Sequence, residues 1–342
     1  MARAGRRSRV TGVLLTAAAV ATAVAAAAVA ATAAADVAPP DAACAADDGT
    51  CAAGGAPSPS AASAAEPPSS PSPPADYSAV ATAHRQVAAG TPPGSTRSVT
   101  AGHGGGSYAL VAPDSRVYGA PPSGWAASDM TAAAVVTHML GAHFSMWLAD
   151  AVDGATSTGP EGAFAERFLY VLSGGLLVPD GEGGERRLGP GGFVYCPSNR
   201  HTRVTADGAT SMILIDRVYE AVGGAPYVVG HEDDVAVEAV PGEAFDLRRL
   251  LPVGDKRYDF NIHIMDFAPG ASLGVREVHY NMHGLVMLRG GGIYRLGREY
   301  FHVTAGDVLW MGPFTLQWYA ALGTTPTRYL LYKDVNRDPT YK

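Results

Sequence analysis

Cysteine, clustered basic charge and helical periodicity are all scarce in this chain of 342 residues. Three cysteines are too few for a disulfide scaffold. The formal net charge is −7 and no cluster of basic and aromatic residues stands out, which argues against nucleic acid as a partner. Helical periodicity is limited to a weak patch at residues 246–250. These absences leave β-strands as the main element that we expect.

Residues 1–35 have the composition of a targeting segment. Four arginines precede a long Ala-rich apolar run, which ends in the small residues Ala33, Ala34 and Ala35. This order is typical of a secretory signal peptide, while an organelle transit peptide and a retained membrane anchor fit the same residues. We expect a secretory signal, with organelle import as the alternative, and no stable membrane span after cleavage.

Residues 36–76 are dominated by Ala, Pro and Ser and lack the apolar residues that an ordered core needs. We interpret this stretch as a disordered linker. Cys44 and Cys51 lie within it and could pair as a local disulfide in an oxidising lumen. Cys196 stands instead in an apolar segment, where we expect a packed core thiol.

Four side chains near the C-terminus have the types and spacing of a metal site. Glu277, His279 and His283 stand at even spacing, so a regular β-strand would point all three to one face. Gln317 follows on a later short strand, after glycine turns. Imidazole together with carboxylate suits Mn, Fe, Zn, Ni or Co. The pattern predicts that these four residues hold a metal on the inner wall of a small antiparallel barrel.

The part of the chain after residue 76 also repeats itself. Three landmarks recur at an offset of 116 residues: Leu172 with Leu288, Pro197 with Pro313, and His201 with Gln317. One shared offset predicts two copies of one fold, built from short strands between Gly and Pro turns. The strand-borne ligand set resembles that of the cupins. We therefore expect an all-β bicupin, with tandem antiparallel β-barrels of jelly-roll type at residues 77–225 and 226–342.

The same offset leaves few metal ligands in the first copy. His283 corresponds to Arg167, and only His201 and Glu161 remain as possible donors. Two donors are too few for a secure metal site. We expect the first barrel to be structural, supporting the other barrel or an oligomer interface, with His201 as a polar residue in a vestigial pocket.

Three motifs in the last third are more specific than a cupin pattern. They are Glu-x-His-Tyr-x-x-His-Gly-Leu at 277–285, Gly-Ile-Tyr-Arg-Leu at 292–296 and Tyr-Lys-Asp-Val-Asn-Arg at 332–337. Together they closely resemble the (S)-ureidoglycine aminohydrolase family, which acts in the ureide pathway of purine and allantoin breakdown. The resemblance covers most of the chain from about residue 77 onward and is strongest at 274–339.

This resemblance implies a hydrolase that converts (S)-ureidoglycine and water to (S)-ureidoglycolate and ammonia. It implies Mn(II) as the cofactor, with the ligands Glu277, His279, His283 and Gln317. It also implies substrate contacts from Tyr294, Tyr329 and Lys333. We expect Glu277, Lys333 and Tyr329 to carry the catalytic roles. The family further implies a large homo-oligomer, and its plant members suggest the lumen of the endoplasmic reticulum.

Two other interpretations fit part of the pattern. Two histidines and a carboxylate also form the facial triad of non-haem iron oxygenases, so an iron-dependent cupin dioxygenase is one alternative. A non-catalytic storage or ligand-binding bicupin is the other. Gln317 and Lys333 argue against the dioxygenase, and the complete set of donor side chains argues against storage.

Overall fold

The computed structural model describes residues 75–81, 99–102, 107–160, 164–198, 200–221 and 223–337. The leader, the linker up to residue 74 and Glu161 lie outside these ranges, so the expectations for them, including the pairing of Cys44 with Cys51, stay predictions. The described residues all belong to one compact unit. Among them, no helix combines the length and the apolar character needed to cross a membrane.

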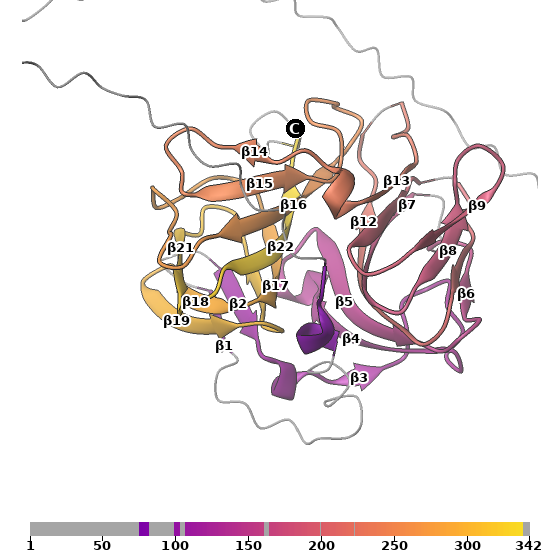
Figure 1. Ribbon diagram of the computed structural model, residues 1–342, viewed down its shortest axis with the longest axis horizontal. Helices are drawn as coiled ribbons and strands as arrows, with labels where there is room; N and C mark the ends of the chain where they lie inside the picture. The colour runs from indigo at the N-terminus through magenta and orange to yellow at the C-terminus, as the bar shows by residue number, and fades with distance from the viewer. Residues whose placement is uncertain are drawn as a thin grey trace, which may run out of the picture. The chain divides into compact units, whose positions relative to one another are not determined.

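The first barrel combines a large and a small antiparallel sheet (Figure 1). Within the described residues, the large sheet has the strand order β13-β10-β7-β12-β5-β4-β3 and the small sheet the order β6-β11-β8-β9. The bounds are β3 Tyr118–Gly119, β4 Met130–Val136, β5 Phe144–Ala151, β6 Thr156–Ser157, β7 Ala165–Ser173, β8 Leu176–Pro179, β9 Glu185–Leu188, β10 Gly192–Cys196, β11 Val204–Ala206, β12 Thr210–Val218 and β13 Val228–His231.

The second barrel has the same plan. Its large sheet has the order β1-β2-β20-β17-β22-β16-β15-β14, and its small sheet has the order β19-β18-β21. The bounds are β1 Val99–Gly102, β2 Ser107–Val111, β14 Glu238–Ala239, β15 Phe245–Arg249, β16 Phe260–Phe267, β17 His283–Arg289, β18 Gly291–Leu296, β19 Glu299–Thr304, β20 Val308–Met311, β21 Gln317–Leu322 and β22 Thr327–Asp334. The described helical turns are short: residues 78–81, Pro113–Ser115, His138–Leu140 and Glu232–Asp234.

The strand positions confirm the predicted all-β fold and its repeat. β5 begins at Phe144 and β16 at Phe260, which are 116 residues apart, and β7, β10 and β12 have counterparts in β17, β20 and β22 near the same offset. Glycine punctuates the repeat at Gly174 and Gly290, which both have a positive φ that favours glycine. The weak helical patch expected at 246–250 is wrong, because residues 245–249 form β15, which pairs with β16 along its length.

Strands cross between the two barrels at both ends of the first barrel. β2 comes before the first barrel in sequence, yet it pairs with β20 of the second. β13 comes after residue 225, yet it pairs with β10 of the first. The sheets therefore exchange strands across the expected division at residues 225 and 226. The second barrel is thus tied to a segment that precedes the first barrel, and the first barrel includes a strand that lies beyond residue 225.

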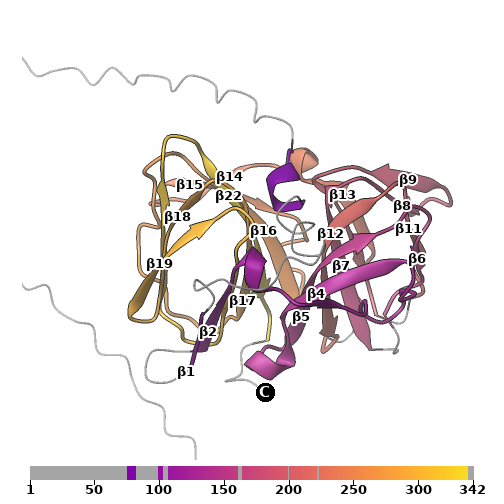
Figure 2. The ribbon, with the colours of Figure 1, turned by 90° about the horizontal axis from the view of Figure 1, so that it is seen from below.

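Three hydrophobic cores hold this arrangement together. One lies inside each barrel, and the third lies between the two large sheets, where the barrels sit side by side (Figure 2). In the core between the sheets, the ring of Phe144 stacks on that of Tyr332 with 3.8 Å between the centroids. Cys196 belongs to the core of the first barrel and is 2% exposed, which confirms the packed thiol expected from the sequence.

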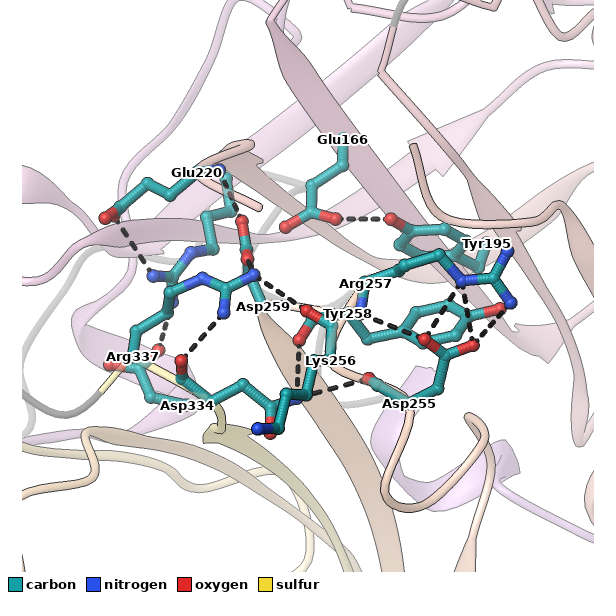
Figure 3. A network of polar contacts seen from close by, with 12 residues as sticks. Glu166, Tyr195, Glu220, Asp255, Lys256, Arg257, Tyr258, Asp259, Asp334 and Arg337 are labelled. Carbon is teal, nitrogen blue, oxygen red and sulfur yellow. Dashed lines mark hydrogen bonds and ion pairs between the residues drawn. The ribbon is translucent and has the colours of Figure 1, made fainter. Parts of the chain in front are cut away.

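Polar groups are also buried where the two large sheets meet (Figure 3). The Tyr195 hydroxyl donates to the carboxylate of Glu166, and the Arg337 guanidinium pairs with Asp259. The backbone N–H of Glu220 donates to Asp259 at 2.5 Å. Burial raises the pKa of Glu166 to about 8, although the hydrogen bond from Tyr195 opposes the rise. Glu166 therefore titrates in the folded protein near neutral pH.

This raised pKa predicts a stability that depends on pH. Because the folded-state pKa of Glu166 lies above its ordinary value, its contribution is fully present below about pH 4.5 and is lost as the pH rises through about 8. The Glu166→Gln variant should not show that loss. Between pH 5 and pH 8 the unfolding free energy of the wild type should therefore fall by up to ~4 kcal/mol more than that of the variant. Urea denaturation at both pH values measures the difference.

The exposed Glu299→Gln variant is the matched control and should follow the wild type at every pH. Identical pH slopes for wild-type protein and Glu166→Gln would show that Glu166 is not the group that titrates.

Candidate active site in the second barrel

A cavity of about 180 Å³ lies inside the second barrel, between its large and small sheets. Side chains at alternating positions of β15, β16 and β22 form one wall, because successive strand residues point to opposite faces. The residues around it are Val240, Phe245, Leu247, Arg249, His263, Met265, Glu277, His283, Tyr294, Gln317, Tyr329, Leu331 and Lys333. Six of the seven site residues predicted from the sequence line this cavity, and His279 is the one that does not.

The predicted metal ligands do not share one strand. Only His283 lies on β17, at its first residue, whereas Glu277 and His279 belong to the irregular segment before it. The expectation of a continuous strand from Glu277 to His283 is therefore wrong. The physical reason is that the segment changes sheets: Glu277 forms an isolated bridge with Gln317 of the small sheet, and the chain then enters the large sheet at His283.

The side chains nevertheless gather around the amide of Gln317. Its Nε2 lies 3.0 Å from Nδ1 of His283 and 3.3 Å from Nε2 of His279, and its Oε1 lies 3.1 Å from the same nitrogen of His283. Nε2 of His279 is 3.9 Å from Oε2 of Glu277. The two imidazoles are close to each other, with ring centroids 4.8 Å apart. The fold thus brings the four predicted donors into one cluster.

In each imidazole the nitrogen that faces Gln317 is the one that a shared cation would use, namely Nε2 of His279 and Nδ1 of His283. The other ring nitrogens, Nδ1 of His279 and Nε2 of His283, are buried and have no hydrogen-bond partner in the described part of the chain. In the described residues no group of three or more His, Cys, Asp or Glu side chains forms a metal-binding cluster by itself. The amide of Gln317 is therefore needed to complete the set.

Electrostatics keep the two imidazoles in the form that binds metals. Burial lowers the pKa of His279 to about 4 and that of His283 well below its ordinary value, and the nearby charge of Lys333 adds to both effects. Neutral imidazole is the ligand form of histidine. Burial raises the pKa of Glu277, while Lys333 opposes the rise. Burial also lowers the pKa of Lys333, which Glu277 in turn opposes.

The predicted substrate contacts surround the same cavity. The hydroxyl of Tyr294 lies 3.3 Å from Oε1 of Gln317 and can donate to it. Burial raises the pKa of both Tyr294 and Tyr329 well above the ordinary value, so both hydroxyls stay protonated donors. Lys333 is half-buried on β22, where its Cα is paired with that of His283 on the next strand. These three side chains place two neutral donors and one cation around the space.

An ion pair replaces this cluster in the first barrel. Arg167, which corresponds to His283, is 1% exposed and bonds both carboxylate oxygens of Asp216 at 2.7 Å. It also donates to the backbone oxygen of Ser123 at 2.9 Å. His201, expected in a vestigial pocket, has an exposed side chain instead. That expectation is wrong because the interior at this level is taken by the arginine and its carboxylate partner.

Sequence reasoning missed three polar residues near the site. Arg249 on β15 and His263 on β16 line the cavity, and Asn261 lies two residues before His263 on the same strand. The signal was present in the sequence, because Asn261 and His263 alternate with the apolar residues Ile262 and Ile264. Such alternation marks polar positions on the inner face of a strand, but it does not say which face encloses a cavity.

Two plant proteins with an assigned activity are similar in sequence to this chain over most of its length. A probable (S)-ureidoglycine aminohydrolase of Oryza sativa subsp. japonica is 45% identical over 249 residues, which cover 72% of this chain and 78% of the relative. The (S)-ureidoglycine aminohydrolase of Arabidopsis thaliana is 43% identical over 249 residues, which cover 72% of this chain and 80% of the relative. No family model matches the chain.

Among solved structures, the crystal structure of protein Ylba from E. coli is similar. It superposes with a TM-score of 0.60 at 30% sequence identity, covering 71% of this chain and 96% of the other. The similarity of sequence therefore extends to the two-barrel fold. With identities above 40% over most of both chains, this protein belongs to the (S)-ureidoglycine aminohydrolase family.

Proposed function

We propose that this protein is a Mn(II)-dependent hydrolase that converts (S)-ureidoglycine and water to (S)-ureidoglycolate and ammonia in purine and allantoin catabolism. The observation that carries the proposal is the cluster of Glu277, His279, His283 and Gln317 beside the cationic Lys333, within a member of this family. One cavity then offers donor atoms for a metal and a positive group for an anionic substrate.

The four clustered side chains would hold the metal. Two neutral imidazole nitrogens, one carboxylate and one amide oxygen form a mixed set that suits Mn(II). When bound, the ion supplies a Lewis acid that can anchor the carboxylate of the substrate. Gln317 contributes no charge, so Glu277 is the only anionic member of the set. A set with one carboxylate repels an anionic substrate less than a set with two.

The remaining groups bind and orient the substrate. Lys333 pairs with the substrate carboxylate as a point charge, because its side chain lines the cavity. Tyr294 and Tyr329 donate hydrogen bonds that orient the ureido end. Apolar residues such as Leu247 and Leu331 line the same space and limit the access of water. This asymmetry of charge and donors would select one face of the substrate.

Glu277 is the group that we propose for proton transfer. In this hypothesis its carboxylate takes the ureido N–H proton of the substrate and passes it to the amino group, which leaves as ammonia as a C=N bond forms. Water then adds across that bond, with its hydroxyl on the carbon and its proton on the nitrogen. A carboxylate beside a metal can act both as ligand and as base. Burial raises the pKa of Glu277, which makes it a stronger base than an exposed carboxylate.

The direct test is to incubate the purified protein and Mn(II) with freshly generated (S)-ureidoglycine and to follow the release of ammonia. A parallel sample without enzyme corrects for spontaneous decay of the substrate. Release at the rate of that control, with Mn(II) bound to the protein, would overturn the proposed function. Oxygen consumption by iron-loaded protein would favour a dioxygenase instead.

We also propose a location and an assembly. The arginines and Ala-rich run of residues 1–35 favour the secretory pathway, with the lumen of the endoplasmic reticulum as the compartment. Large exposed apolar side chains, among them Phe164, Phe314 and Met139, favour a homo-oligomer that covers part of this surface.

The double role of Glu277 leads to the next prediction. Glu277→Gln should abolish turnover while the protein keeps most of its Mn(II), because an amide can still ligate a metal but cannot take a proton. Elemental analysis of the purified variant and an ammonia assay separate the two roles. Loss of the metal together with turnover would demonstrate the ligand role alone. Full metal with full turnover would contradict the role in proton transfer.

The role of Lys333 can be tested in the same assay. Lys333→Ala should raise KM for (S)-ureidoglycine roughly tenfold to a hundredfold, because a hydrogen bond to a charged group is worth about 1.5–3 kcal/mol. Lys256→Ala, which removes an exposed lysine from the same barrel, is the matched control and should leave KM unchanged. An unchanged KM in Lys333→Ala would remove Lys333 from the substrate site.

A further inference from the structure

A second cavity, of about 300 Å³, adjoins the first within the second barrel. Three side chains line both spaces: Arg249, His263 and Lys333. The second cavity also has Asn261 in its wall, whereas Tyr294, Tyr329 and Glu277 line only the first. Lys333 therefore separates a tyrosine side from an asparagine side. A substrate whose carboxylate binds Lys333 can therefore direct one group toward the tyrosines of the first cavity and another toward Asn261 in the second.

Asn261 carries a buried acceptor that has no partner within the described ranges of the chain. The residue is 4% exposed, and its Nδ2 donates to the backbone oxygen of Leu251 at 2.9 Å. Because a carbonyl oxygen can only accept, this bond fixes which end of the amide is nitrogen. Its Oδ1 is buried and has no hydrogen-bond partner among the residues that the structure describes. A buried acceptor left in this state destabilises the free protein, which suggests that a ligand supplies the donor.

The surroundings of Asn261 determine which ligand group fits. Asn261 on β16 and Lys333 on β22 are direct cross-strand partners, so their side chains lie on the same face of the sheet. Arg249 adds a second cation, which pairs with Glu238 at 3.0 Å. Burial lowers the pKa of His263 to about 3, so this neighbour is neutral. A cationic donor would meet two positive side chains here, and an uncharged donor is therefore favoured.

We infer that Oδ1 of Asn261 accepts a hydrogen bond from the amino group of the substrate, the group that leaves as ammonia. This role rests on the proposed function, and it makes Asn261 a specificity-determining residue. In (S)-ureidoglycine the amino and ureido groups are attached to the carbon next to the carboxylate. With the carboxylate on Lys333 and the ureido group toward Tyr294 and Tyr329, the amino group is directed to the opposite side, where Asn261 lies.

The test compares the substrate with an analogue that lacks the amino group. N-carbamoylglycine keeps the carboxylate and the ureido group and has hydrogen in place of the amine. We would measure KM and kcat for (S)-ureidoglycine, and the inhibition constant of N-carbamoylglycine, for the Mn(II)-loaded wild type and for Asn261→Ala. Asn261→Leu is a second variant that keeps most of the side-chain volume if the alanine variant does not fold. Calorimetric titration of N-carbamoylglycine measures binding independently of turnover.

The expected result is selective. Both variants should raise KM for (S)-ureidoglycine by about fivefold to tenfold, as the loss of one neutral hydrogen bond predicts, while the affinity for N-carbamoylglycine changes by less than about twofold. Ser145→Ala is the matched control, since Ser145 holds the position of Asn261 in the first barrel at the offset of 116 residues. It should leave all constants unchanged.

Three outcomes would overturn the inference. If both variants are active and their KM for (S)-ureidoglycine is unchanged, the contact with Asn261 is excluded while the proposed function still stands. Equal weakening of (S)-ureidoglycine and N-carbamoylglycine would place Asn261 against a group that the two molecules share. A wild-type protein that neither releases ammonia from (S)-ureidoglycine nor binds N-carbamoylglycine would overturn the proposed function together with this role.

Discussion

The side chains of strand β22 alternate between two environments, the core between the barrels and the cavity, and the rest of the structure depends on this alternation. Its outward side chains, including Leu330 and Tyr332, lie in the core between the two large sheets. Its inward side chains, including Tyr329 and Lys333, line the cavity. Because successive strand residues point to opposite faces, the packing between the barrels also fixes the groups that would face the substrate. A shift in register by one residue would exchange the two sets.

Charges buried between the sheets are compensated by partners from distant parts of the chain. Arg328 is 1% exposed and lies 2.8 Å from a carboxylate oxygen of Glu232, and it also donates to Asp266 at 2.7 Å. The hydroxyls of Tyr77 and Tyr170 donate to the same Glu232. Removal of one partner would leave an uncompensated buried charge, which is strongly destabilising. Since Glu232 directly follows β13, this network anchors the strand that lies beyond residue 225 yet pairs with the first barrel.

The two barrels share a strand plan and differ in what occupies the interior. The second barrel has neutral imidazoles around an amide, and some of their buried nitrogen atoms have no hydrogen-bond partner among the described residues. The first barrel has Arg167 paired with both oxygens of Asp216 at the equivalent level. The ion pair satisfies its own polar atoms, so this interior is complete without an added cation. The contrast explains how one copy can carry a reactive site while the other contributes packing.

The sequence by itself determined the all-β two-barrel fold, because short apolar segments between Gly and Pro turns, and landmarks that recur at a constant offset, can be recognised in the linear chain. It also singled out four donor residues that the fold brings together. Only the tertiary structure decided that Glu277 bridges to Gln317 of the small sheet, that His201 is exposed, and that Asn261 lines a second cavity. The sequence also contained no indication that β2 pairs with the second barrel or that β13 pairs with the first. The physical reason is that each of these features depends on pairing between strands that are distant in sequence, and the register of such pairing follows from the packing of the whole core and not from any local pattern.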